Sequence, residues 1–202
     1  ADQDVSVVLL DVNTPGGSVT DSDLIYNRIK QVRAAGKHVY VLFGDLCASG
    51  GYYLAVAAHE IWSRPTSITG SIGVIVPSFS MVELLSKVGI ADQSVASGKN
   101  KQILGATKTM TAEQREIVEA VVMEMYERFI GLVAEGRDLE LDKVRILADG
   151  RLYSADQAKK NGLVDEVGYR DDLIDKIRDS HGQSLSLVEY RAPISFFDSL
   201  AG

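Results

Sequence analysis

Two apolar runs in the first quarter of the chain have the pattern of strands in a parallel sheet. Residues 5–12 (VSVVLLDV) and 38–43 (HVYVLF) are almost continuously apolar and are bounded by turn-forming residues, which is typical of strands buried on both faces. Between them, apolar residues recur at helical spacing over positions 24–32, and Gly36 follows where a left-handed cap favours glycine. The pattern predicts an internal parallel strand, a glycine turn, a helix and a second strand.

The alternation of strands and helices continues past the middle of the chain. The small-residue run 49–58 (SGGYYLAVAA) predicts a helix packed closely against the sheet. Short strands are expected over residues 60–63, 71–76 and 92–96, and a helix is expected over residues 81–87.

The clearest predicted helix begins at Thr111 and ends at Gly136. Gln114, three residues after Thr111, completes the capping-box pattern that marks a helix start. One face of this helix is polar. The other face carries Ile117, Val121, Met125, Phe129 and Leu132.

The last quarter of the chain continues the same alternation. Residues 149–153 predict a turn and a short strand, and Ser154 is expected to cap a helix that ends at Lys160. A final helix is predicted over residues 171–178. Because the chain has no repeat of fixed period and no low-complexity segment, the fold class is predicted to be a layered α/β domain.

The domain is expected to cover residues 1–182, and residues 183–202 form a tail. The tail contains Pro193 and the apolar residues Ile194, Phe196 and Phe197. Exposed aromatic side chains would be a liability in a monomer. The tail is therefore interpreted as a docking arm.

The composition is that of an ordinary globular protein, with 46% hydrophobic and 24% charged residues among 202. The net charge of −7 is spread without a Lys/Arg-rich stretch, which argues against nucleic acid and anionic membrane surfaces as partners. No apolar run approaches the ~20 residues of a spanning helix, so the chain is expected to be soluble as given. Cys47 is the only cysteine, and its apolar surroundings favour a small core residue over a nucleophile.

Two glycine turns each follow a predicted strand and precede a predicted helix, a position at which backbone N–H groups can stabilise negative charge. The first, residues 14–18 (TPGGS), is explained equally well as a tight turn whose glycines supply positive φ. The second, residues 47–51 (CASGG), is explained by itself as a helix start, because a serine such as Ser49 at an N-cap is more often structural than nucleophilic.

A nucleophilic serine needs a base, for which histidine is the first candidate and lysine the alternative. A lysine can serve when burial lowers the pKa of its ammonium toward neutrality. Residues 97–103 (SGKNKQI) offer Lys99 and Lys101, although most lysines are solvated. No motif and no metal-ligand spacing surrounds any of the histidines, which are His38, His59 and His181.

Five motifs occur in the order that a known family shows. They are residues 12–18 (VNTPGGS), 48–53 (ASGGYY), 69–74 (TGSIGV), 97–102 (SGKNKQ), and 150–153 (GRLY) continued by 162–168 (GLVDEVG). On these motifs, nearly the whole chain resembles the signal peptide peptidase A family, serine peptidases that use a Ser-Lys dyad. The resemblance implies a Clp-protease-like or crotonase-like layered α/β fold of repeated strand-strand-helix units.

The resemblance also implies roles for single residues. Ser49 would be the nucleophile, Lys101 the general base, and Lys99 a solvated neighbour. Ser71 would hold the lysine near the nucleophile through a hydrogen bond.

The first glycine turn would then be an oxyanion hole. The N–H of Gly16 is expected to bind the oxyanion, with Gly17 or Gly50 contributing. The implied reaction is acyl transfer, which needs no metal or cofactor.

The family resemblance sets expectations for partners and location. The substrates would be cleaved signal peptides or other extended apolar peptides, and a homo-oligomeric ring is expected. Whether the serine and the lysine of the dyad come from one subunit or meet across a subunit boundary stays open on the sequence. Family members usually carry a membrane anchor and further strands before the first glycine turn, so this chain is expected to be a fragment, a processed form or a truncated form. The full-length protein is expected at the bacterial cytoplasmic membrane.

Three alternatives stay open on the sequence. A crotonase-type acyl-CoA hydratase or isomerase would also use glycine N–H pairs, but it would leave Ser49 and Lys101 without roles. A histidine-dependent Clp protease would need a histidine near Val74, where the sequence has none. An inactive ring-forming scaffold is the non-enzymatic alternative.

Overall fold

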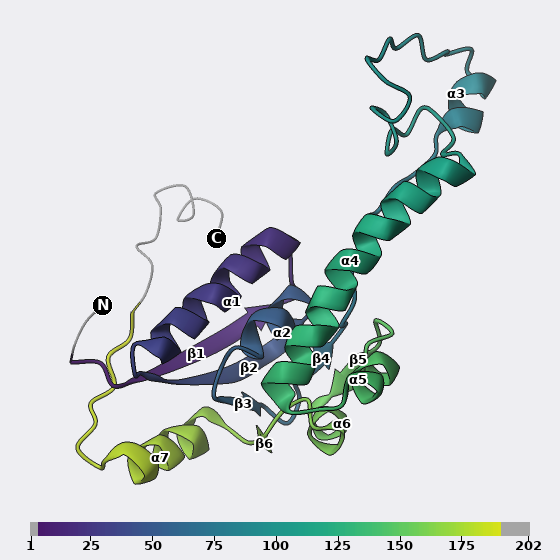
Figure 1. Ribbon diagram of the computed structural model, residues 1–202. Coiled ribbons are helices and arrows are strands. Elements are labelled where there is room, and N and C mark those ends of the chain that lie inside the picture. Colours follow the sequence, from purple (N-terminus) through teal and green to yellow (C-terminus); the bar gives the residue numbers. More distant parts are fainter. Residues whose placement is uncertain (1–3, 191–202) are drawn as a thin grey trace. The chain divides into compact units, whose positions relative to one another are not determined.

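The computed structural model describes residues 4–190 in two compact units, the first ending at Tyr169 and the second beginning at Arg170. The first unit is an α/β domain built on one six-stranded sheet (Figure 1). The second contains α7 (Arg170–His181), which confirms the final predicted helix. The elements of the first unit are β1 (Val7–Thr14), α1 (Val19–Ala34), β2 (His38–Ala48), α2 (Gly50–Ala55), β3 (Glu60–Ser63), β4 (Ile68–Gly70), α3 (Val82–Lys87), α4 (Ala112–Arg137), α5 (Leu141–Leu147), β5 (Leu152–Ser154), α6 (Ala155–Asn161) and β6 (Glu166–Val167).

Strand β2 is the centre of the sheet because it is long enough to pair with three strands. On one side it pairs in parallel with β1, and on the other its residues 40–43 pair with β3 and its residues 46–48 pair with β4. Strand β6 continues the sheet in parallel beyond β3, whereas β5 pairs antiparallel with β4. The carboxyl ends of β1, β2 and β4 therefore lie together, and each is followed by one of the motifs found in the sequence.

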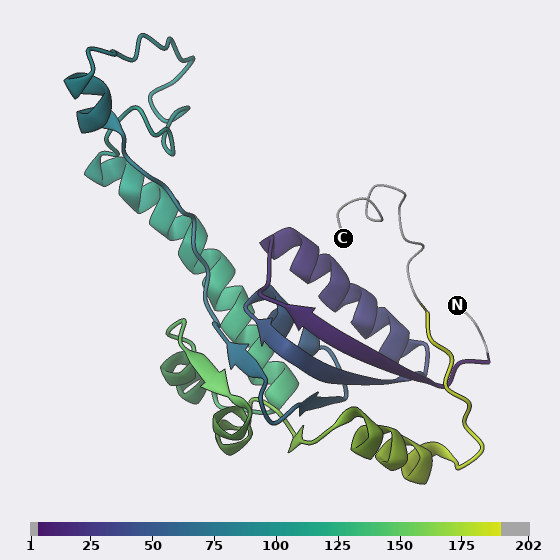
Figure 2. The same ribbon diagram turned by 180° about the vertical axis from the view of Figure 1, so that it is seen from behind.

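The helices α1 and α2 and the C-terminal half of α4 cover one face of this sheet (Figures 1 and 2). Tyr52 of α2 is fully buried in the core, and its hydroxyl donates to the Leu163 carbonyl at 2.8 Å. That bond satisfies a polar group that would otherwise be buried without a partner. Other large side chains buried in this core include Phe43, Ile61, Ile72 and Ile130.

The prediction that the first strand is internal and buried on both faces is wrong. Strand β1 pairs only with β2 among the described residues, and none of its residues falls in the buried class. Its apolar side chains instead contribute partly buried contacts to one core. A continuous apolar run does not show how many neighbours a strand has, since pairing is decided by the tertiary fold.

Helix α4 begins and ends close to its predicted bounds. The Gln114 N–H donates to Thr111 Oγ1 at 3.2 Å, and the Thr111 N–H donates to Gln114 Oε1 at 3.1 Å, which confirms the capping box. However, only part of the apolar face is covered: Phe129 is 3% exposed, whereas Ile117 and Val121 are 42% and 46% exposed. The N-terminal half of α4 extends beyond the sheet (Figure 1).

Two predicted strands are absent. Residues 71–76 form no strand, because Ser71 has a φ of 49° and ends β4. Residues 92–96 form a loop, in which the Ser94 N–H donates to Asp92 Oδ1 at 2.7 Å. Such a side-chain bond competes with strand pairing. We refer to residues 74–110 as the distal segment. It first runs alongside α4, and α3 and the loops that follow it lie at the N-terminal end of α4 (Figures 1 and 2).

The remaining predictions concern shorter elements. Strand β3 and helix α3 confirm the predictions for residues 60–63 and 81–87, and α2 is shorter than the predicted helix over residues 49–58. Ser154 caps α6 with a capping box, as predicted. Helix α5 was not predicted, since its start after Glu140 has no side-chain cap. The proposed docking residues of the tail lie outside the described residues.

Candidate active site

Ser49 lies on a sharp turn between β2 and α2. Its backbone has φ 53° and ψ −117°, a conformation that is strained for a residue with a Cβ. Ser49 is the N-cap of α2, but its side chain makes no capping hydrogen bond to the described residues. Capping of the helix by its side chain, the usual structural role of a serine at a helix start, therefore does not explain the serine at position 49. Strain of this kind concentrates at functional positions.

The first glycine turn packs directly against the Ser49 turn. A Cβ on Gly16, whose φ is 108°, would lie 2.8 Å from both Ser49 Cβ and the Gly50 nitrogen. A Cβ on Gly50 would lie 2.3 Å from Ser22 Oγ and 3.2 Å from the Gly17 nitrogen. Both positions therefore need glycine for close approach of the two backbones.

The N–H groups of the two turns differ in their partners. The Gly16 N–H donates to Thr14 Oγ1 at 3.2 Å. The N–H groups of Gly17 and Gly50 donate to no acceptor within residues 4–190. The two free N–H groups lie next to Ser49, where an oxyanion formed on attack by the serine could accept from them.

Ser71 follows β4 beside the Ser49 turn. The Ser49 N–H donates to the Gly70 carbonyl at 2.9 Å, and the Ser71 N–H donates to the Arg151 carbonyl at 2.8 Å. Both serines have positive φ, which only Asp138 shares among the described residues other than glycine. The structure thus brings Ser49 and Ser71 to adjacent positions at the carboxyl ends of paired strands.

Lys101 lies in the distal segment, at the N-terminal end of α4, whereas Ser49 lies near the C-terminal half of that helix. Its loop is fixed to the first turn of α4 by a hydrogen bond of 3.0 Å from Gln114 to a loop carbonyl. Near α2, the rings of Phe129 and Tyr53 lie 4.9 Å apart. Helix α4 rises about 22 Å between Gln114 and Phe129, at about 1.5 Å per residue. One chain therefore does not bring Lys101 within hydrogen-bonding reach of Ser49.

A hydrogen-bonded ion pair between Arg128 and Asp23 holds α4 against α1, and Tyr53 of α2 shares it. The Arg128 guanidinium donates to Asp23 Oδ1 at 2.6 Å, and the Tyr53 hydroxyl donates to the same oxygen at 2.6 Å. The bond from Tyr53, followed by that from Arg128, lowers the pKa of Asp23. Burial, with the bond to Asp23, raises the pKa of Tyr53 to about 12. This group ties α1, α2 and α4 together.

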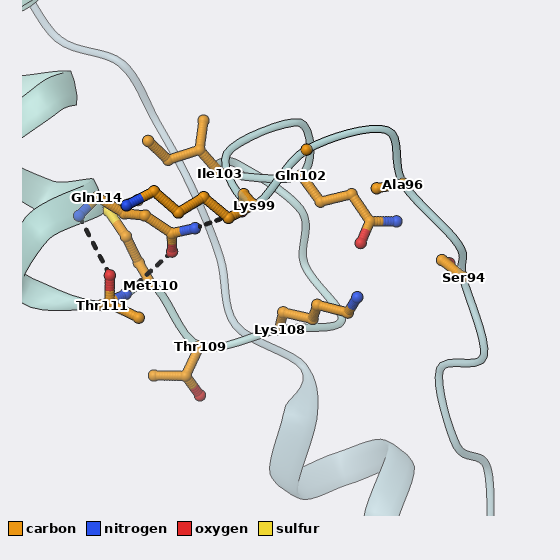
Figure 3. A pocket seen from close by; sticks show the side chains of 11 residues that line it. Ser94, Ala96, Lys99, Gln102, Ile103, Lys108, Thr109, Met110, Thr111 and Gln114 are labelled. Carbon is orange, nitrogen blue, oxygen red and sulfur yellow. Dashed lines mark hydrogen bonds between the residues drawn. The ribbon is translucent and has the colours of Figure 1, made fainter.

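The distal segment contains a pocket of about 390 Å³ that is remote from Ser49 (Figure 3). Its lining includes Lys99, Gln102, Lys108 and Gln114. Gln102 Oε1 is buried and accepts no hydrogen bond from any described residue. Lys99 is instead exposed and paired with Glu113 at 2.6 Å.

The sequence also offered a cysteine and histidines as candidate groups. Cys47 is fully buried, which raises the pKa of its thiol, and this fits the predicted core role. His38 begins β2 and His59 immediately precedes β3, so both lie at amino ends of strands, opposite to Ser49.

Within residues 4–190, no group of three or more His, Cys, Asp or Glu residues could hold a metal ion. No helix in that same range combines the length and the apolar character that crossing a bilayer requires.

The arrangement of sheet and helices is the Clp-protease-like α/β fold. A ClpP1 mutant from Listeria monocytogenes is similar to this structure with a TM-score of 0.55, at 21% identity, over 83% of this chain and 78% of that chain. The likeness to ClpP1 concerns the fold alone.

The chain belongs to peptidase family S49, which it matches over residues 31–184. It is 35% identical over 175 residues to Protease 4 of Salmonella typhi, covering 87% of this chain and 28% of the relative. It is 34% identical over 161 residues to the chloroplastic serine protease SPPA of Arabidopsis thaliana, covering 79% of this chain and 24% of the relative.

A relative from Enterococcus faecium, whose name contains the words signal peptide peptidase SppA, is 34% identical over 199 residues and covers 98% of this chain. This chain spans 58% of the length of that relative and 59% of a protease relative from Synechocystis.

The sequence motifs did not indicate every residue that shapes the site. Thr14 and Ser22 contact the glycine turns, and Arg128 pairs with Asp23 across more than half of the chain. Thr14 lies inside the motif at residues 12–18, which was a usable signal. The partners of Ser22 and Arg128 are distant in sequence, so no local pattern could have identified them.

Proposed function

We propose that this chain is the catalytic part of a serine peptidase. Ser49 gives its proton to the amine of Lys101, and its Oγ attacks the carbonyl carbon of a peptide bond. The oxyanion accepts hydrogen bonds from the N–H groups of Gly17 and Gly50. The protonated lysine returns the proton to the leaving amine, and a water molecule then hydrolyses the acyl-enzyme.

The observation that carries this proposal is the geometry of the Ser49 turn. A strained serine without a capping bond lies against a glycine turn, so close that a Cβ on Gly16 would come within 2.8 Å of the Ser49 Cβ. Two N–H groups beside the serine have no acceptor within the described residues. The sequence prediction named Gly16 as the oxyanion donor. The bond from the Gly16 N–H to Thr14 favours Gly17 and Gly50 for that role, with Gly16 shaping the turn.

We propose further that Lys101 acts on the Ser49 of a neighbouring copy in a homo-oligomeric ring. Within one chain, α4 separates the two residues. The distal segment that carries Lys101 also exposes apolar side chains, as a subunit interface would before assembly. These include Ile75, Phe79, Val88, Ile90 and Val95, which are 57–99% exposed.

Ser71 is proposed to position the incoming lysine. It lies beside Ser49, and its hydroxyl could accept a hydrogen bond from the ammonium of Lys101. Gln102, next to Lys101 in sequence, has a buried acceptor without a partner in the described residues, which a donor from a neighbouring copy would satisfy.

The substrate class is proposed from the relatives. Signal peptides left after cleavage, or other extended apolar peptides, fit the wording in the name of the Enterococcus faecium relative. Attachment of the whole protein to the bacterial cytoplasmic membrane would then come from a part outside this chain.

Subunit mixing tests both the dyad and its division between copies. Ser49→Ala and Lys101→Ala are each expected to be inactive on a fluorogenic apolar peptide. Lys99→Ala, the matched control from the same loop, is expected to be nearly normal because Lys99 is exposed and paired with Glu113. Random mixing of equal amounts of the two inactive variants restores an intact pair at about a quarter of the interfaces. Recovered hydrolysis is therefore expected.

Mass spectrometry under native conditions would verify that the copies exchange. No recovery despite confirmed exchange would show that the dyad is not shared between copies. An active Ser49→Ala variant would contradict the proposed function itself.

A further inference from the structure

Thr14, the last residue of β1, forms hydrogen bonds with both the N–H and the carbonyl of Gly16. Its Oγ1 accepts from the Gly16 N–H at 3.2 Å and lies 3.3 Å from the Gly16 carbonyl oxygen, to which its hydroxyl donates. Its methyl group, Cγ2, lies 2.7 Å from where a Cβ on Gly51 would be. Thr14 is therefore fixed between the glycine turn and the helix that follows Ser49.

The bond to the Gly16 carbonyl also fixes the proposed oxyanion donor. The Gly16 carbonyl and the Gly17 N–H belong to one peptide group, and in a planar trans peptide they point in opposite directions. Drawing the carbonyl toward Thr14 therefore turns the Gly17 N–H away from Thr14. The Gly17 nitrogen lies 3.2 Å from the Cβ position of Gly50, on the side of the Ser49 turn.

Packing against the Ser49 turn places Gly16, and the bond from Thr14 adds a constraint on the rotation of the Gly16–Gly17 peptide group. Gly16 has a φ of 108°, and glycine populates positive and negative φ with similar ease. A Cβ on Gly17 would meet no atom within 4 Å, so no side-chain contact on that side of Gly17 fixes the peptide group. A hydrogen bond on the carbonyl also polarises the peptide group, which makes its N–H a stronger donor.

We propose that Thr14 is a positioning residue, whose hydroxyl orients and polarises the Gly16–Gly17 peptide so that the Gly17 N–H binds the oxyanion. This inference rests on the proposed serine peptidase function. Thr14 touches neither the substrate nor the reacting atoms. Its hydroxyl acts through the peptide group that it holds, so its removal affects the transition state more than substrate binding.

The test compares two substitutions that divide the threonine side chain. Thr14→Val removes the hydroxyl and keeps the methyl group on Gly51, whereas Thr14→Ser keeps the hydroxyl and removes the methyl group. Thr20→Val, at an exposed position in α1, controls for the chemical change alone. For each variant, kcat and KM on a fluorogenic apolar peptide are measured together with the affinity for a peptide boronate, whose tetrahedral adduct places an oxygen in the oxyanion hole.

Thr14→Val is expected to lower kcat about tenfold or more, a fraction of the 10²–10³-fold loss seen when an oxyanion donor is removed. KM is expected to stay near the wild-type value, and boronate affinity to fall in parallel with kcat/KM. Thr14→Ser is expected to retain most of the wild-type kcat. Thermal unfolding monitors whether each variant is folded.

Equal kinetics for Thr14→Val and Thr14→Ser would overturn the inference, as would a change confined to KM. A loss of kcat without a loss of boronate affinity would also overturn it. If the wild-type protein hydrolyses no peptide and Ser49 reacts with no boronate, the proposed function has failed instead. The two failures are therefore distinguishable.

Discussion

Replacing Gly50 with alanine probes how closely the two glycine turns must approach. The new Cβ would lie 2.3 Å from Ser22 Oγ, 3.2 Å from the Gly17 nitrogen and 3.4 Å from Gly16 Cα. Ser22 cannot turn away freely, because it is only 5% exposed and its hydroxyl donates to the Ser18 carbonyl at 2.9 Å. The collision must therefore move Ser22, the glycine turn, or both.

The expected change in the free energy of unfolding can be estimated from the contact of the new Cβ with Ser22 and from the hydrogen bond that Ser22 makes. Overpacking of this kind costs about 1–3 kcal/mol of the free energy of unfolding. Removing the Ser22 hydroxyl alone forfeits a single hydrogen bond, worth about 1 kcal/mol. In the double variant Gly50→Ala/Ser22→Ala, the 2.3 Å contact no longer exists. The loss of stability in the double variant is therefore expected to be smaller than the sum of the single losses by about 1–2 kcal/mol.

Catalysis is expected to respond differently from stability. The contacts of the new Cβ with Gly16 and Gly17 remain in the double variant, so the proposed oxyanion donor stays displaced. Urea unfolding of the two single variants and the double variant measures the coupling between Gly50 and Ser22, and peptide hydrolysis measures kcat. We expect the double variant to regain stability while its kcat stays well below that of Ser22→Ala.

Two outcomes would refute this reasoning. Additive losses of stability would mean that the side chain at position 22 is not what the new Cβ meets. A double variant with the kcat of Ser22→Ala would mean that the spacing between Gly50 and the glycine turn does not matter for the reaction.

Two further predictions concern how α4 is attached. Gly136→Ala places a Cβ 2.4 Å from the Val56 carbonyl oxygen, whereas Gly131→Ala in the same helix meets no atom within 4 Å. Both substitutions gain about 1 kcal/mol of helix propensity. Urea unfolding should therefore find Gly136→Ala less stable than Gly131→Ala by about 1–3 kcal/mol. Equal stabilities of the two variants would contradict the close contact between position 136 and the Val56 carbonyl. Asp23→Asn is expected to lower the Tm near neutral pH. Because the folded-state pKa of Asp23 lies below its ordinary 3.8, the carboxylate stabilises the fold above that pH, and this stabilisation is lost as the pH falls through the folded pKa. The Tm difference from wild type should therefore narrow on acidification from pH 6 to pH 3, and a constant difference would contradict the role of the charge.

The sequence by itself determined the order and type of most elements and the family of the chain. Local signals account for this: the capping box at Thr111, the cap at Ser154 and the glycine motifs around Gly16 and Ser49 act within a few residues. The family resemblance implied that Gly16, Ser49 and Ser71 belong together, and the structure places each of them after a strand whose carboxyl end reaches the same edge of the sheet.

Only the tertiary structure decided which strand has a neighbour on each side and which half of α4 is covered. An apolar run looks alike whether its second face meets a helix, another copy or solvent, so Val121 and Phe129 cannot be told apart by periodicity. The tertiary structure also decided that Lys101 and Ser49 lie near opposite ends of α4. A motif gives the order of residues, whereas the position of the Lys101 loop at the first turn of α4 depends on tertiary contacts such as that of Gln114 with the Lys99 carbonyl. The contact of Thr14 with the Gly16 carbonyl likewise depends on where β1 ends against β2.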